Sequence, residues 1–229
     1  MIRCLVFDFD GVLVDTNEVK RDAFYRIFQG FGEAGRRWVS DTLELDVDSD
    51  RFRIIQLVID QAVSEGAIDR AVDRDSLVRK YGVEYNDICE EYATNCPEIA
   101  GAEAGIATLS LKYPLYINSA TPEEPLRRIV ANRGWSEWFK AILGRPGTKL
   151  EHLIEVMERE AIAPEQLAFV GDGKRDMEAA RTVGCQFVGI RNAFNDFETT
   201  GLTMLGDMRP ILETVETLDS QLPASAFIK

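Results

Sequence analysis

The chain has 229 residues, of which 45% are hydrophobic and 28% are charged. This length suits one large domain or a core domain with a smaller insert, and the composition excludes the disordered classes. The formal net charge of −13 argues against nucleic acid as a partner, because a protein that binds a phosphate backbone needs a basic surface. A small anion can still bind in a locally positive pocket.

The cysteines and the apolar runs bear on the compartment. We find no C-x-x-C pair and no secretory charged and apolar regions at the N-terminus, so we expect free thiols and a cytoplasmic location. No run of about 18 apolar residues occurs, and no membrane span is expected. The sequence makes no prediction of oligomeric state. The four scattered cysteines are Cys4, Cys89, Cys96 and Cys185.

The first predicted element is a strand over Ile2 to Phe7, an apolar run of the kind buried on both faces of a parallel sheet. Asp8 and Asp10 follow it, and side chains two positions apart on an extended chain point the same way. Repulsion between two such carboxylates raises the pKa of one of them unless a divalent cation binds. Gly11 then permits a turn that few other residues adopt. An ordinary polar turn explains this D-x-D-G equally well when it is taken alone.

The next stretch, residues 16–96, reads as helical. Helices are predicted over Asn17 to Phe28, Arg51 to Val63 and Ser76 to Tyr92. We therefore expect an all-helical domain at 16–96, inserted into a core domain made of residues 1–15 and 97–229. Gly and Pro near residues 96–101 mark the return to that core.

The remaining sequence alternates between strands and helices, which predicts an α/β fold with a doubly wound, parallel, Rossmann-like sheet. In such sheets ligands bind at the carboxyl ends of the strands, near the point where the strand order reverses. Thr121 is predicted to cap one of the helices, with Pro122 at its first position. The predicted strands are Leu115 to Ser119, Ala141 to Leu143, Leu167 to Val170 and Gln186 to Ile190, and the helices are Glu123 to Arg133, Lys149 to Glu160, Lys174 to Val183 and Met208 to Leu218.

Four side chains in this part of the chain are candidates for chemistry. Ser119 ends a strand ahead of a helix N-terminus, where its hydroxyl and the neighbouring amides can hold a phosphate oxygen. Lys149 lies in the first turn of a helix, which the macrodipole disfavours, although a solvated surface lysine is the default for that residue alone. Asp172 ends a strand and Asp176 lies where a helix begins, and hard oxygen ligands at strand ends suit Mg²⁺. Neither a P-loop nor a complete dinucleotide fingerprint is present.

Together these pieces resemble the haloacid dehalogenase superfamily, and in particular its phosphatases of the phosphoglycolate phosphatase and β-phosphoglucomutase-like type. The resemblance covers the first 14 residues and most of 114–184, and the helical insert looks like the cap domain of this superfamily. The matching pieces are D8-F-D10-G, Ser119 after an apolar strand, Lys149 opening a helix, and G171-D172-x-x-x-D176.

The resemblance implies Mg²⁺-dependent hydrolysis of a small-molecule phosphate monoester, a sugar or organic-acid phosphate, through an aspartyl-phosphate. Asp8 would be the nucleophile, and Asp10 would protonate the leaving oxygen and then activate water. The metal would be held by Asp8, the backbone carbonyl of Asp10 and Asp172, and Asp176 would support either the metal shell or Lys149. Ser119 and Lys149 would neutralise charge on the transferring group. Gly11 and Ala120 would join the substrate-binding residues.

Several alternatives stay open within this resemblance. Asp10 and Asp172 argue for phosphate ester chemistry and against halide displacement. A sugar phosphomutase of the β-phosphoglucomutase type is the main alternative, and a non-catalytic binding module is a weaker one. Where those mutases, and many phosphatases, carry a histidine in the first cap helix, this chain has Lys20, and we prefer hydrolysis to the mutase reaction.

The insert should also set the choice of substrate. Lys20 and Arg51 are predicted to grip a carboxylate or a second phosphate, with solvated helix-face residues as the alternative. The chain's one histidine, His152, is predicted to lie on the surface. Trp135 and Trp138 are predicted to pack in the core or at its edge.

Overall fold

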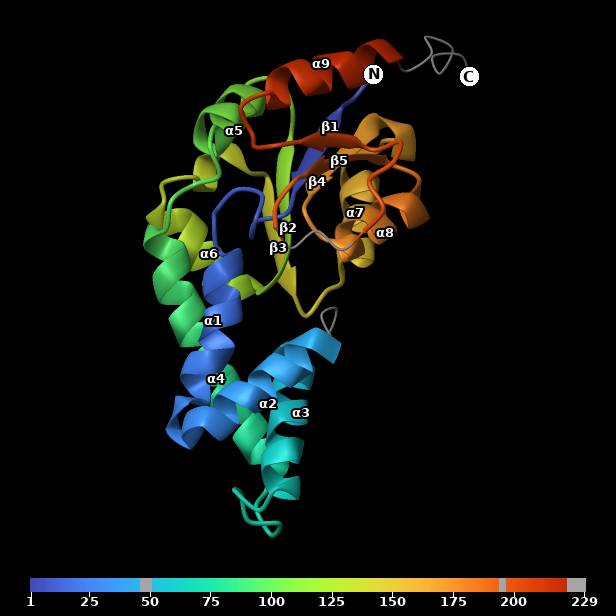
Figure 1. The fold of residues 1–229 in the computed structure, drawn as a ribbon. Helices are drawn as coiled ribbons and strands as arrows, with labels where there is room; N and C mark the ends of the chain where they lie inside the picture. Colours follow the sequence, from blue (N-terminus) through green and yellow to red (C-terminus); the bar gives the residue numbers. More distant parts are fainter. Residues whose placement is uncertain (46–50, 194–196, 222–229) are drawn as a thin grey trace. The chain divides into compact units, whose positions relative to one another are not determined.

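The protein is described here by a computed structural model, which covers residues 1–45, 51–193 and 197–221 (Figure 1). It divides into two compact units, one formed by Met1–Asp15 with Ala93–Lys229 and the other by Thr16–Tyr92. No helix in the described part of the chain has the length and apolar character needed to cross a membrane.

The first unit contains a six-stranded sheet in the order β3-β2-β1-β4-β5-β6. All adjacent strands run parallel. The α/β fold and the parallel, doubly wound sheet predicted from the sequence are therefore confirmed. The strands are β1 (Cys4–Phe7), β2 (Leu115–Pro122), β3 (Ala141–Arg145), β4 (Leu167–Gly171), β5 (Gln186–Ile190) and β6 (Thr203–Leu205).

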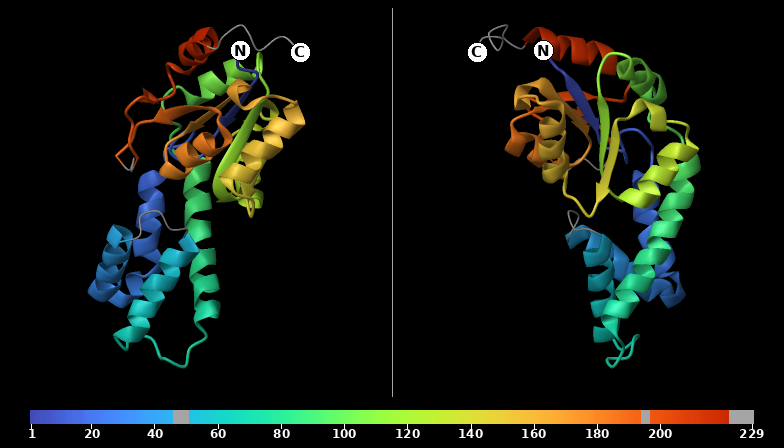
Figure 2. Two further views of the ribbon diagram at one scale, coloured as in Figure 1. Left: turned by 90° about the vertical axis from the view of Figure 1, so that its right-hand side faces the viewer. Right: turned by 180° about the vertical axis from the view of Figure 1, so that it is seen from behind.

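Both faces of this sheet are apolar, which explains the continuous hydrophobic runs in the sequence. On β1, Leu5 and Phe7 join one buried cluster, whereas Cys4 and Val6 join another. Helices α7 and α8 pack over the second of these clusters and lie against each other (Figure 2). Residues of α5, α6 and α9 belong to the first cluster. The helices are α5 (Ala102–Ser110), α6 (Glu123–Asn132), α7 (Lys149–Glu160), α8 (Lys174–Val183) and α9 (Ile211–Gln221), with short 3₁₀ turns at Ser136–Trp138 and Pro164–Gln166.

Trp135 is 1% exposed in the first cluster and Trp138 packs against that cluster, so the prediction that they pack in the core or at its edge is confirmed.

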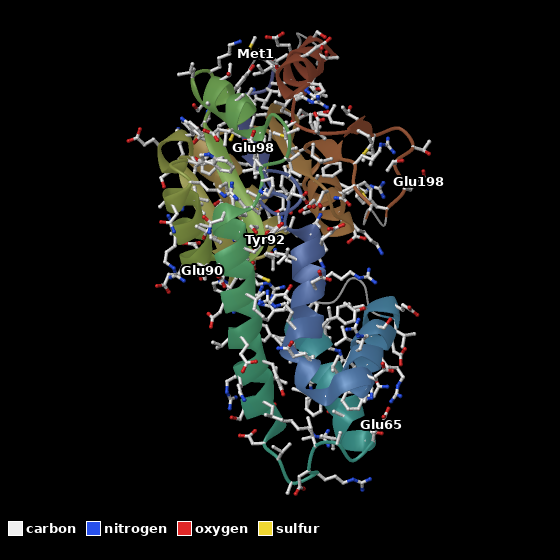
Figure 3. All side chains as sticks on the ribbon, turned by 60° about the vertical axis from the view of Figure 1, so that its left-hand side comes forward. Met1, Glu65, Glu90, Tyr92, Glu98 and Glu198 are labelled. Carbon is white, nitrogen blue, oxygen red and sulfur yellow. The ribbon has the colours of Figure 1, made fainter. Side chains whose placement is uncertain are left out.

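The second unit is helical and has its own core. It contains α1 (Asn17–Ile27), a 3₁₀ turn at Gln29–Phe31, α2 (Gly32–Leu45), α3 (Arg51–Ser64) and most of α4 (Arg74–Asn95). Phe28, Trp38 and Ile55 are among the buried side chains that form its apolar cluster. Tyr92, the last residue of this unit, is labelled on α4 in Figure 3.

Candidate active site

The candidate site lies at the carboxyl ends of β1 and β4, which are neighbours in the sheet. Because β2 lies on one side of β1 and β4 on the other, the strand order reverses here, and such switch points are where open α/β sheets bind ligands. Asp8 follows β1 directly, and its amide donates a hydrogen bond to the carbonyl of Val170 at 2.8 Å. Asp172 follows the last residue of β4.

A buried ion pair joins Lys149 to two aspartates. The Lys149 Nζ lies 2.7 Å from Asp8 Oδ1 and 2.9 Å from Asp176 Oδ1, and the lysine side chain is 12% exposed. The ammonium also donates to the carbonyl of Asn118 at 2.6 Å. The sequence alone assigns an exposed surface to such a lysine by default, but the beginning of α7 turns this one towards the ends of β1 and β2.

Burial and charge shift the pKa of both partners. Burial raises the pKa of Asp8 well above its usual range, the carboxylates of Asp176, Asp172 and Asp10 raise it further, and Lys149 opposes them. Burial by itself lowers the pKa of Lys149, but the charges of Asp176 and Asp8 outweigh burial and raise it. Lys149 therefore keeps its charge, whereas ionised Asp8 needs more positive charge nearby than Lys149 provides.

Three carboxylates could supply a cation with ligands. Asp8, Asp172 and Asp176 each offer an oxygen atom, and these atoms all lie within 4.8 Å of one another. Hard oxygen donors at this spacing fit a divalent cation such as Mg²⁺, whose positive charge would favour the ionised form of the buried Asp8. Asn192 orients one of the three by donating to Asp172 Oδ2 at 2.7 Å.

Each carboxylate oxygen of Asp176 has a partner that holds the side chain in place. Oδ1 pairs with Lys149, and Oδ2 accepts a hydrogen bond from the Gly173 amide at 3.1 Å. Gly171, the last residue of β4, makes room for it, because a Cβ atom at this position would lie 2.4 Å from the Asp176 Cβ. These contacts make Asp176 a support for Lys149 as much as a possible metal ligand.

Asp10 is held by two hydroxyl groups. Thr121 Oγ1 donates to Asp10 Oδ2 at 2.9 Å, and Ser119 Oγ donates to the same oxygen at 3.3 Å. The predicted role of Thr121 as a helix cap is wrong, because β2 continues to Pro122 and α6 begins only at Glu123. Thr121 and Ser119 lie two positions apart on an extended strand, and this spacing is the signal that could have placed both beside Asp10.

His152 is 6% exposed, so the prediction that it lies on the surface is wrong. It follows Lys149 by one helical turn and therefore shares the face of α7 that packs on the sheet. Its Nδ1 lies 2.8 Å from Asn118 Oδ1, and Asn118 Nδ2 donates to the Lys149 carbonyl at 2.9 Å. Burial lowers the pKa of His152, which favours the neutral ring. Sequence analysis missed both His152 and Asn118 as positioning residues.

The N-terminus of α7 is further fixed by its cap. Thr148 accepts a hydrogen bond from the Glu151 amide at 3.2 Å, and the Glu151 carboxylate accepts from the Thr148 amide at 2.8 Å. This capping box makes Lys149 the first residue of the helix. The two hydrogen bonds of the capping box stabilise the helix N-terminus, which offsets the unfavourable placement of Lys149 at the positive end of the helix dipole.

The remaining predicted site residues lie in different surroundings. Gly11 has a φ of 74°, and its amide donates to the Val14 carbonyl at 2.8 Å, which closes the turn after Asp10. Ala120 is exposed at the end of β2. Lys20 lies in α1 and Arg51 begins α3, both in the second unit, so their role towards a substrate stays a prediction.

The chain is similar to proteins of a known family and to solved structures. The profile of a family described as haloacid dehalogenase-like hydrolase matches residues 5–190. The phosphoglycolate phosphatase of Escherichia coli strain K12 is 30% identical over 125 residues, which are 52% of this chain and 48% of that protein. The chain thus aligns with about half the length of the curated relatives it matches.

Two of the solved structures with this fold come from Bacillus subtilis and Thermotoga maritima. The putative HAD-hydrolase YfnB of Bacillus subtilis, bound to magnesium, superposes with a TM-score of 0.70 at 16% identity and covers 93% of this chain and 98% of its own. A putative β-phosphoglucomutase of Thermotoga maritima superposes with a TM-score of 0.68 at 19% identity and covers 94% of this chain and 99% of its own.

Proposed function

Because the chain belongs to the haloacid dehalogenase-like hydrolase family, we propose that it hydrolyses a small-molecule phosphate monoester, a sugar phosphate or an organic-acid phosphate, with Mg²⁺ as cofactor. The observation that carries this proposal is the buried Asp8 carboxylate at the switch point, paired with Lys149 and lying beside Asp172. The curated relatives named phosphoglycolate phosphatase support the choice of a phosphate ester.

Asp8 is proposed as the nucleophile. Lys149 and the Phe9 amide both contact Asp8 Oδ1, at 2.7 Å each, so we assign the attack on phosphorus to Oδ2. The new bond joins Oδ2 to phosphorus as the bond from phosphorus to the ester oxygen breaks, which gives an aspartyl-phosphate and an alcohol. Water then attacks the same phosphorus, which releases inorganic phosphate and restores the Asp8 carboxylate.

Asp10 is proposed to move the proton in both steps. As an acid it protonates the leaving ester oxygen, and as a base it takes a proton from the attacking water. The hydroxyl groups of Ser119 and Thr121 hold its Oδ2 in place. Ser119 and Lys149 also face the transferring group and offset its negative charge, together with the amide of Ala120.

The acidic cluster is proposed to hold Mg²⁺. Asp8, the backbone carbonyl of Asp10 and Asp172 are the proposed ligands, and Asp176 supports them through Lys149. The ion supplies the positive charge that keeps Asp8 ionised and that offsets charge on the phosphoryl oxygens. The solved structure of a magnesium-bound protein with this fold supports the same choice of metal.

Phosphate release tests the proposal. A panel of sugar, organic-acid and nucleotide monophosphates is assayed with and without Mg²⁺, using the wild type, Asp8→Asn, and Glu137→Gln as a control in an exposed carboxylate. Mg²⁺-dependent release that Asp8→Asn abolishes and Glu137→Gln retains would support the proposal. Release that survives Asp8→Asn would overturn the assignment of the nucleophile.

A sugar phosphomutase is the second candidate, because this fold is shared with a putative β-phosphoglucomutase. Conversion of a hexose 1-phosphate to its 6-phosphate, without net phosphate release, would favour the mutase. Binding of phosphate esters with neither reaction would favour a non-catalytic module. Lys20→Ala and Arg51→Ala test the predicted grip on the substrate, since unchanged kcat/KM values would remove both residues from the site.

A further inference from the structure

Asn118 lies on β2 directly before Ser119 and joins that strand to the first residue of α7. It is buried, and its Nδ2 donates a hydrogen bond to the carbonyl of Lys149 at 2.9 Å. Its own backbone carbonyl accepts a hydrogen bond from Lys149 Nζ at 2.6 Å. Asn118 therefore contacts the lysine at two points, the backbone from which the side chain starts and the ammonium group that pairs with Asp8.

These contacts decide which nitrogen of His152 carries a proton. The carbonyl of Lys149 can only accept, so the NH₂ group of Asn118 must face it and Oδ1 must face the His152 ring. His152 Nδ1 lies 2.8 Å from this Oδ1, and an oxygen acceptor needs a donor, so Nδ1 must carry a proton. Burial lowers the pKa of His152, which favours the neutral ring. The neutral ring with a proton on Nδ1 has none on Nε2.

Gly147, in the loop before α7, makes room for the same ring. A Cβ atom at this position would overlap His152 Nε2 and would lie 2.8 Å from Cδ2. The φ of Gly147 is not positive, so the ring, and not the backbone, is what requires a glycine here. The ring is therefore fixed on two sides, by the hydrogen bond to β2 and by its contact with this loop.

We propose that Asn118 and His152 are positioning residues, which hold the Lys149 ammonium against Asp8 in the place that phosphoryl transfer needs. This inference rests on the proposed function, in which Ser119 and Lys149 face the transferring group. Because Asn118 precedes Ser119 in the chain and binds Lys149, it also fixes the spacing between these two groups. A lysine side chain is long and has many rotamers, so its ammonium needs such contacts to stay in one place. His152 acts through Asn118, whose amide it holds in one orientation.

The wild type alone tests the first link, because His152 is the only histidine in the chain. Protein with ¹⁵N-labelled histidine, produced without a histidine tag, contains one labelled imidazole, and NMR shows which of its nitrogens carries a proton. We expect a proton on Nδ1 and none on Nε2 at about pH 8, above the ordinary pKa of histidine. A neutral ring with its proton on Nε2 would overturn the inference, because Nδ1 could then not donate to Asn118.

Kinetics test the effect on Lys149. A misplacement of about 1 Å can cost about 100-fold in rate, so we expect Asn118→Ala to lower kcat by about 10- to 100-fold and His152→Leu by about tenfold. KM should change little, because the charge of Lys149 acts on the transferring group in the transition state. Asn132→Ala, at an exposed position at the end of α6, is the control and should change neither value. Equal kcat values in the wild type, Asn118→Ala and His152→Leu would overturn the inference.

A second set of variants separates the hydrogen bond of His152 from its packing. His152→Asn puts an amide NH₂ group where Nδ1 lies and so keeps the donor, whereas His152→Gln puts the NH₂ group where Nε2 lies. We expect His152→Asn to recover most of the kcat that His152→Leu loses, and His152→Gln to recover little of it. Equal kcat values for His152→Asn and His152→Leu would overturn the role of the hydrogen bond.

Binding of orthovanadate separates this inference from the proposed function, because this anion resembles the transition state of phosphoryl transfer and needs no turnover. With Mg²⁺ present, Asn118→Ala and His152→Leu should weaken its binding by about the factor that they take from kcat. Weaker binding that His152→Asn restores, in a protein that releases no phosphate from any ester, would leave the positioning of Lys149 standing and overturn the hydrolase. Phosphate release that requires Asp8, with the same kcat and vanadate affinity in all these variants, would do the reverse.

Discussion

Replacing Lys149 by methionine removes the charge that two buried aspartates share. The side chain keeps an unbranched shape, but Asp8 and Asp176 lose a partner at 2.7 Å and 2.9 Å, and the Asn118 carbonyl loses a donor at 2.6 Å. Breaking a buried ion pair by removal of one partner costs about 3–5 kcal/mol. Because one cation here serves two carboxylates, we expect Lys149→Met to lower the free energy of unfolding by about 4–5 kcal/mol near pH 8 without divalent cations.

The pH dependence follows from the raised pKa of Asp8. A carboxyl group whose pKa is higher in the folded than in the unfolded state stabilises the fold below its ordinary pKa, and this stabilisation is lost as the pH rises through the raised value. The loss of Lys149 raises that pKa further, so Lys149→Met should lie closer to the wild type near pH 5 than near pH 8. Added Mg²⁺ should recover part of the loss near pH 8.

Urea unfolding followed by circular dichroism measures these differences. Lys140→Met is the matched control, because Lys140 pairs with Glu160 at 3.0 Å but has a 58% exposed side chain, and exposed pairs contribute about 1 kcal/mol or less. An equal loss near pH 5 and near pH 8 would refute the electrostatic reasoning, since lost packing does not depend on pH.

Three further changes test other contacts of the site. Asp8→Asn should raise the free energy of unfolding near neutral pH without divalent cations, because the raised pKa of Asp8 means that its charged form is disfavoured in the folded state. This gain should grow as the pH rises from about 4 to about 8. A pH-independent difference in urea unfolding would contradict this. His152→Leu leaves the buried Asn118 Oδ1 without its partner and should cost about 1–3 kcal/mol above about pH 6.5. Because burial lowers the pKa of His152, the wild type loses this stabilisation as the pH falls below that range, so the cost should shrink in acid, and a constant cost would count against the neutral ring. Gly171→Ala forces its Cβ against Asp176 and should lower the free energy of unfolding by about 1–3 kcal/mol and remove most of the phosphate release. Gly206→Ala is the control, because a Cβ there meets nothing within 4 Å, and it should change neither quantity. Equal effects of the two substitutions would refute the close fit at Gly171.

The strands of the core could be predicted because both faces of the sheet are buried, and strands buried on both faces consist of continuous apolar runs. Strand β6 was missed because it has three residues, of which Thr203 is exposed. Helix α2 was missed because Gly32 and Gly35 resemble loop residues. Gly35 is instead a close-packing position, since a Cβ there would lie 2.5 Å from the Phe28 carbonyl oxygen.

The aspartates of the candidate site could be predicted for a topological reason, since residues that follow parallel strands meet at one edge of the sheet. Asp8 and Asp172 follow adjacent strands in this way. The contacts of His152 were not predicted, because a single polar residue beside the buried Leu153 and Val156 does not by itself report whether it is buried or exposed.

The position of β1 in the sheet has a consequence during synthesis. Leu5 pairs with Ala168, roughly 160 residues later in the chain, and the ribosome needs about 8–30 s to make that segment at about 5–20 residues per second. Until then the apolar strand that leads into Asp8 lacks one neighbour and is exposed to non-native contacts. The helical unit Thr16–Tyr92 contains its own apolar cluster and is made in this interval. We therefore expect nascent chains that end before β4 to fold only in that unit and to need a chaperone for β1.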